Sequence, residues 1–148
     1  MSFDPKEFRD KIEQVLKDFD EVLASKSAVN LLLGTCAVES DFGMYSKQLK
    51  GPALGVFQME PGTYNWLISV YKERYPQLKS WQFHELEKDV EKAVVMARLR
   101  YRIVPAQLPL AGDTLALAMY WKKWYNTELG KGTVQKFMAK YNKYVLQV

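Results

Sequence analysis

Apolar residues recur at helical spacing along most of this 148-residue chain. The first such stretch follows Asp4, which suits a helix cap, and Pro5, which suits the first helical position. The pattern predicts six helices. They run from Pro5 to about Leu23, from Ser25 or Ser27 to about Glu39–Gly43, from Pro61 to before Pro76, from about Glu85 to Arg102, from Asp113 or Thr114 through Trp121, and from Thr133 through Tyr141.

The second of these helices is mostly apolar, so we expect it to lie at the centre of the fold. Gly43 is a suitable stop signal for it. Residues 44–60 contain two glycines and a proline and have no helical period, which predicts a loop with a short β hairpin or ribbon around Leu54 to Met59. The expected fold is therefore a single domain over residues 1–148. It is mainly α, of the α+β kind, with about six helices and one small β ribbon or loop after the central helix.

Composition narrows the chemistry. The chain holds one Cys and one His, which argues against an internal disulfide and against a zinc site, so we expect no metal and no cofactor. The formal net charge of +4 favours approach to anionic material. Lys and Arg are spread along the chain without a block of five, and no nucleic-acid-binding motif is present, so nucleic acid is not an expected partner.

The pattern of apolar residues bears on location too. No apolar run approaches the roughly 20 residues that span a bilayer, so membrane insertion is not expected. The first residues lead directly into a charged helix and do not resemble a signal peptide.

Glu39 is the strongest candidate for catalysis. Cleavage of a glycosidic bond needs a proton donor, and a glutamate donates near neutral pH only when its surroundings raise its pKa. Glu39 follows Ala37 and Val38 near the carboxyl end of the most apolar helix. Burial there, together with the negative end of the helix dipole, is expected to raise the pKa of Glu39.

Two sequence motifs extend this interpretation. Glu39-Ser40-Asp41-Phe42-Gly43 is followed by Ser46 and then by Ala53-Leu54-Gly55-Val56-Phe57-Gln58-Met59-Glu60-Pro61-Gly62-Thr63. This arrangement resembles the core of the soluble lytic transglycosylases and goose-type lysozymes, which belong to the lysozyme-like superfamily. The second motif is Trp124-Tyr125-Asn126, which matches another element of that family in part. Residues 120–133 as a whole resemble the version of this element found in phage-encoded transglycosylase domains.

The resemblance implies a role for each matched residue. Glu39 is implied as the general acid and then the base. Ser46 is expected near Glu39 or the substrate, Gln58 and Met59 along the sugar cleft, and Tyr125 with its hydroxyl close to Glu39. Asn126 is expected to hold the loop that follows Tyr125.

Two outcomes of bond cleavage stay open. A lytic transglycosylase cleaves the MurNAc–GlcNAc β-1,4 bond of peptidoglycan with a single Glu. The muramic 6-hydroxyl attacks within the same sugar and gives a 1,6-anhydro product. A hydrolytic lysozyme (muramidase) needs activated water, for which Asp41 is the nearest second carboxylate, although a turn or capping role suits Asp41 better. The absence of an obvious second acid favours the transglycosylase.

A further alternative is a non-catalytic phage structural or wall-binding protein on the same scaffold. Without a signal peptide, a wall-cleaving enzyme needs delivery, so we expect a place in the phage virion or delivery by the phage to the host periplasm or cell wall. The expected partners are peptidoglycan glycan strands and, in a particle, other virion proteins.

Overall fold

The computed structural model describes residues 2–46, 51–126 and 130–146, and six α-helices lie within these ranges. They are α1 (Pro5–Asp20), α2 (Lys26–Ser40), α3 (Pro61–Tyr71), α4 (Val90–Arg102), α5 (Thr114–Trp121) and α6 (Val134–Tyr144). Five of the six begin with a side-chain oxygen that accepts a backbone N–H of the first turn, from Asp4, Ser25, Asp89, Asp113 and Thr133. The predicted mainly α fold class is confirmed.

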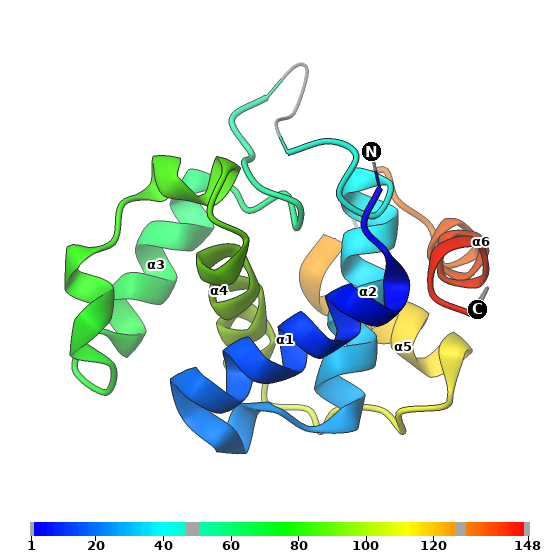
Figure 1. Ribbon diagram of the computed structural model, residues 1–148, viewed down its shortest axis with the longest axis horizontal. Coiled ribbons are helices and arrows are strands. Elements are labelled where there is room, and N and C mark those ends of the chain that lie inside the picture. Colours follow the sequence, from blue (N-terminus) through cyan, green and yellow to red (C-terminus); the bar gives the residue numbers. More distant parts are fainter. Residues whose placement is uncertain (1, 47–50, 127–129, 147–148) are drawn as a thin grey trace.

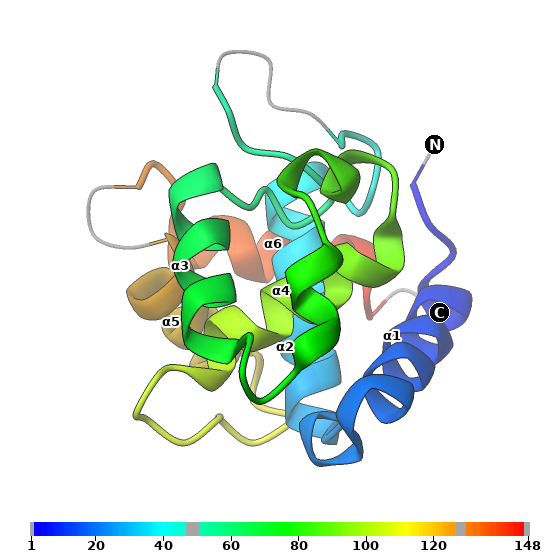
Figure 2. The same cartoon turned by 90° about the vertical axis from the view of Figure 1, so that its left-hand side faces the viewer.

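Helix α2 lies at the centre of the molecule, as predicted. It contacts α1, α4, α5 and α6. Figure 1 shows α1 crossing in front of α2, with α3 and α4 on one side of it and α6 on the other. Seen from the side, α3 and α4 lie in front of α2 (Figure 2).

Close packing of α2 against α6 depends on Gly34. A Cβ atom at this position would lie 2.2 Å from Cζ of Phe137 on α6. The two helices therefore approach each other at a point where only a hydrogen side chain fits.

Helix boundaries differ from the sequence prediction in two places. The first helix stops at Asp20, because the Asp20 carboxylate caps a separate 3-10 turn, η1 (Glu21–Leu23). The helix predicted from about Glu85 instead divides into a 3-10 turn, η3 (Phe83–Glu87), and α4. Asp89 causes the second division, since its carboxylate accepts the backbone N–H of Lys92 and so starts a new helix.

The predicted β ribbon is reduced to a single bridge. Leu54 and Met59 form an isolated antiparallel pair, with both N–H···O distances 3.0 Å, and it is the one β element among the described residues. The chain turns tightly between them, because the N–H of Gln58 donates to the carbonyl of Gly55 and both residues take positive φ, +50° and +84°. The ladder is not extended away from the turn, because the chain enters α3 at Pro61, two residues after Met59.

Two short helical segments complete the architecture. A 3-10 turn, η2 (Pro76–Ser80), lies between α3 and η3. A π-helical turn, η4 (Lys122–Asn126), follows α5 directly. Within the part of the chain that the structure describes, no helix combines the length and apolar character needed to cross a membrane.

Candidate active site

A buried serine and a left-handed turn end α2 immediately after Glu39. The Ser40 hydroxyl donates to the carbonyl of Cys36 at 3.0 Å and accepts the N–H of Gly43 at 2.9 Å. Asp41, Phe42 and Gly43 all take positive φ, so the chain reverses within three residues. Helix α2 therefore ends at Ser40, with Asp41 as its C-cap, within the predicted range of Glu39 to Gly43. Ser40 and Gly43 of the first motif thus act locally, by shaping the helix end that carries Glu39.

Glu39 lies in a cleft of about 850 Å³. One wall includes Gln58 and Met59 from the Leu54–Met59 turn, and the other includes Trp121 of α5, residues of η4 and residues 130–132. The lining residues are Val38, Glu39, Tyr45, Ala53, Gln58, Met59, Glu60, Thr63, Arg100, Trp121, Tyr125, Asn126, Gly130, Lys131, Gly132 and Lys136. The motif that runs from Glu39 to Thr63 and the motif Trp124-Tyr125-Asn126 are far apart in the chain, and residues of both line this one cleft.

The Glu39 carboxyl is partly buried at this cleft and has an unusual proton affinity. Burial raises the pKa of Glu39 from 4.5 to about 7, and the negative charge of Glu60 acts in the same direction. A hydrogen bond from the indole of Trp121, with Nε1 3.0 Å from Oε2 of Glu39, opposes the rise. The predicted rise in the pKa of Glu39 is confirmed. A carboxyl with a pKa near 7 can both give and take a proton at neutral pH.

Tyr125 ties the two walls together. Its hydroxyl donates to the carbonyl of Phe57 at 2.6 Å, across the cleft from η4 to the Leu54–Met59 turn. Its ring packs against Tyr101, with the ring centroids 5.2 Å apart. Burial raises the pKa of Tyr125 well above its ordinary value, and the charge of Glu39 adds to the rise. Tyr125 is thus a neutral donor that lines the cleft beside Glu39.

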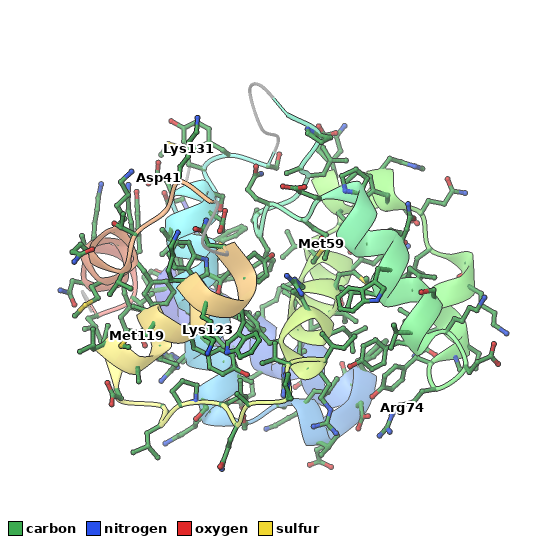
Figure 3. The ribbon with its side chains drawn as sticks, turned by 180° about the vertical axis from the view of Figure 1, so that it is seen from behind. Asp41, Met59, Arg74, Met119, Lys123 and Lys131 are labelled. Atoms are coloured by element: carbon green, nitrogen blue, oxygen red, sulfur yellow. The ribbon has the colours of Figure 1, made fainter. Side chains whose placement is uncertain are left out.

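Gln58 and Met59 lie on the opposite wall. The Gln58 side chain turns back on its own turn, since Nε2 donates to the carbonyl of Gly55 at 3.0 Å. Gln58 is also held at a positive φ of +50°, a conformation that costs a non-glycine residue energy. Met59 is almost wholly buried, and Figure 3 shows it on the α3 side of the molecule.

Asn126 ends the π-helical turn and is held by a lysine. The Nζ atom of Lys122 donates to Oδ1 of Asn126 at 2.8 Å and to the carbonyl of Gly130 at 3.0 Å. Gly130 and Gly132 pass so close to Asn126 and Trp121 that a Cβ at either position would lie 2.4 Å from them. Asn126 lines the cleft.

Two predicted residues are not brought to the cleft. The Asp41 carboxylate pairs with Lys140 of α6, and in Figure 3 Asp41 lies on the α6 side of α2. The left-handed turn explains this, because it directs Asp41 away from Glu39. Ser46 is half-buried, and its carbonyl accepts the N–H of Gly55 at 2.6 Å. Neither Asp41 nor Ser46 is among the described residues that line the cleft.

The structure adds lining residues that the sequence interpretation passed over. Trp121 is buried like a core residue, with 1% of its surface exposed, but its one polar side-chain atom is bonded to Glu39. Glu60 is the second carboxylate of the cleft, and it stands directly after Met59 in the matched motif. Three cationic side chains also line the cleft: Arg100, Lys131 and Lys136.

A second hollow, of about 690 Å³, lies between the start of α1 and residues 85–91. It is lined by acidic, basic and apolar side chains, none of which belongs to the two motifs. The larger cleft alone combines the motif residues with a group of shifted pKa, so we place the candidate active site there.

Comparison with models of protein families, with curated proteins and with solved structures finds no match.

Proposed function

We propose that this protein is a peptidoglycan lytic transglycosylase in which Glu39 serves first as acid and then as base. The observation that carries the proposal is the carboxyl of Glu39, with a pKa of about 7, bonded to a buried indole within a cleft of about 850 Å³. The resemblance of the two motifs to the soluble lytic transglycosylases names the substrate class.

The reaction follows from one carboxyl. Protonated Glu39 gives its proton to the glycosidic oxygen, the C1–O bond breaks, and the electron pair stays on the leaving oxygen. Glu39, now a carboxylate, takes the proton of the muramic 6-hydroxyl while that oxygen bonds to C1. The acid is restored and no water is consumed. Because the 6-hydroxyl belongs to the same sugar, its attack needs no second reactant to be positioned.

The charges of the cleft suit an anionic polymer. Arg100, Lys131 and Lys136 line it together with Glu60, while Glu39 is largely protonated below neutral pH. The stem peptides on glycan strands of the bacterial wall carry carboxylates, as do lactyl groups that lack a peptide. Cations along a cleft attract such groups and raise their local concentration.

Hydrolysis is the second candidate, and the position of Glu60 favours it. Glu60 lines the same cleft as Glu39 and raises its pKa through charge. A second carboxylate of this kind activates water in a hydrolase, which here would give a reducing-end muramic acid.

Purified peptidoglycan incubated with wild type, Glu39→Gln and Glu73→Gln tests the proposal. Glu73 is an exposed carboxylate just beyond α3 and serves as the matched control. We expect Glu39→Gln to lose about 10³-fold in rate, the scale of a lost general acid, and Glu73→Gln to match wild type. Equal clearing by all three proteins would refute catalysis by Glu39, whereas clearing by none of them would leave the non-catalytic wall-binding alternative.

Mass spectrometry of the products separates the two reactions. An anhydro product is one water lighter than a reducing-end product. Anhydro-muropeptides from wild type support the transglycosylase, and reducing ends support the hydrolase.

The resemblance of residues 120–133 to phage-encoded transglycosylase domains extends the proposal to location: this protein acts on the host wall from a phage particle. Immunoblots of purified virions test this. Its detection in virions supports a role in entry, whereas its detection in the infected-cell lysate alone supports lysis.

A further inference from the structure

Lys122 and Lys123 are consecutive in the chain, and such a lysine pair usually lies on a solvent-exposed surface. The structure gives the two lysines different surroundings. Lys123 is exposed, with Nζ 4.9 Å from the ring centroid of Trp124. Lys122 is half-buried, and its ammonium is bonded to two groups on the wall of the cleft.

The two bonds of Lys122 link two residues of the cleft lining that are separated in the chain. One goes to the side chain of Asn126, the last residue of the π-helical turn, and the other to the backbone carbonyl of Gly130. Both acceptors line the cleft. An ammonium shared between an amide oxygen and a carbonyl is a charge-assisted link, about twice as strong as a bond between neutral groups.

The wall that Lys122 holds includes Trp121, whose indole donates to Glu39, and Tyr125. Trp121 and Tyr125 flank Lys122 and Asn126 in the chain, and both line the cleft beside Glu39. Gly132 also passes close to the Trp121 ring. Any widening of this wall admits water to a carboxyl whose pKa is raised mainly by burial.

We propose that Lys122 is a positioning residue: its ammonium clamps Asn126 to Gly130 and so keeps the wall of the cleft closed against Glu39. Lys122 does not touch the reacting bond. The role rests on the proposed function for its effect on catalysis, but its effect on Glu39 can be measured in the absence of any substrate.

The Trp121 indole provides that measurement. Its N–H donates to Glu39, so its ¹H–¹⁵N resonance reports the ionisation of Glu39 as pH changes. The chain has four tryptophans, and Trp121→Phe identifies the signal by its loss. Titrations compare wild type with Lys122→Met, which keeps the aliphatic bulk but not the donors, with Lys122→Arg, which keeps donors, and with the neighbouring control Lys123→Met.

The sign of the shift distinguishes the clamp from simple charge. Loss of a nearby positive charge raises the pKa of a carboxyl or leaves it unchanged, whereas entry of water lowers it. We therefore expect the Trp121 midpoint to move to lower pH in Lys122→Met and to stay near wild type in Lys122→Arg and Lys123→Met. If Lys122→Met does not fold, Lys122→Gln takes its place, because its amide is too short to reach both acceptors.

Activity gives the second readout. With peptidoglycan as substrate, Lys122→Met is expected to lose about 10-fold or more in kcat/KM, because a displaced cleft wall misaligns the substrate with Glu39. The alkaline limb of its pH profile is expected to move in the same direction as the Trp121 midpoint. An unchanged or raised midpoint in Lys122→Met overturns the clamp, as does an equal fall in Lys123→Met. If wild type itself cleaves nothing, the proposed function fails, and the titration still decides the role of Lys122.

Discussion

The indole of Trp121 and the carboxyl of Glu39 form a hydrogen bond of 3.0 Å between α5 and the end of α2. Because an indole N–H can only donate, this bond stabilises the ionised carboxylate. It therefore limits the rise in the pKa of Glu39 that burial causes. Two opposed effects at one atom leave Glu39 with a pKa of about 7, where its proton can be given and recovered.

Trp121→Phe removes that opposing effect. We expect the pKa of Glu39 to rise above its wild-type value, so the alkaline limb of the activity profile moves to higher pH. The smaller ring also leaves a void, which is expected to cost roughly 1–3 kcal/mol of unfolding free energy. Activity measured from pH 5 to 9, with urea denaturation, checks both. Trp124 makes no bond to Glu39, so the control Trp124→Phe should leave the alkaline limb of the activity profile in place. An equal shift of the limb in Trp124→Phe would contradict the role given to the Trp121 hydrogen bond.

Glu60→Gln separates the two proposed reactions. Its charge raises the pKa of Glu39, so neutralising it is expected to move the alkaline limb to lower pH. In a transglycosylase the variant keeps a near-normal rate at pH 5, where Glu39 is protonated in either protein. In a hydrolase that uses Glu60 to activate water, the rate falls about 10²-fold or more at every pH. Initial rates at pH 5 and pH 7 distinguish these results.

The stability of the fold depends on pH through Glu39. Its pKa is about 7 when folded and 4.5 as the ordinary value, so the folded state binds the proton more tightly. The resulting stabilisation is complete below pH 4.5 and is lost as pH rises through 7. At about 1.4 kcal/mol per pKa unit, the loss is at most roughly 3.5 kcal/mol.

Urea denaturation of wild type and Glu39→Gln between pH 4.5 and 8 measures this loss. The free energy of unfolding of wild type should fall relative to that of the variant across the interval. Groups such as Asp20 and Glu85, whose pKa values are lowered by hydrogen bonds and ion pairs, titrate in both proteins and cancel in the difference. Parallel curves would contradict the raised pKa.

Asp41→Asn tests whether the carboxylate beside the motif takes part in cleavage. Asp41 pairs with Lys140 in a partly exposed position, so the loss is expected to cost under about 1 kcal/mol. Asparagine tolerates the left-handed conformation at this position. The cleavage rate should equal that of wild type, and a loss of 10-fold or more would return Asp41 to the list of catalytic groups.

Much of the fold could be predicted because its signals are local. A helix cap acts on N–H groups two or three residues away, so Asp4, Ser25, Asp113 and Thr133 mark helix starts within their own sequence. The boundaries that differed also have local causes. Asp20 and Asp89 are caps too, but they lie inside longer apolar patterns that favour an unbroken helix.

The site was less predictable because its contacts are remote in sequence. Trp121 lies 82 positions after Glu39, and nothing in its neighbourhood marks its N–H as a partner for a carboxyl. Asp41 illustrates the converse, since it is two positions from Glu39 yet points to α6. The turn that redirects it uses positive φ at Asp41 and Phe42, residues that do not usually adopt it.

Helix α6 packs closely against α2, with Phe137 against Gly34, and this packing has a consequence for how the protein is synthesised. The end of α2 is completed from both directions, by Phe3, whose N–H donates to the carbonyl of Phe42, and by Lys140 and Tyr144 of α6. A ribosome delivers Glu39 well before α6 (Val134–Tyr144). During synthesis the carboxyl therefore exists for some hundred residues of elongation before its helix end is closed, so the site is assembled only after α6 has been made.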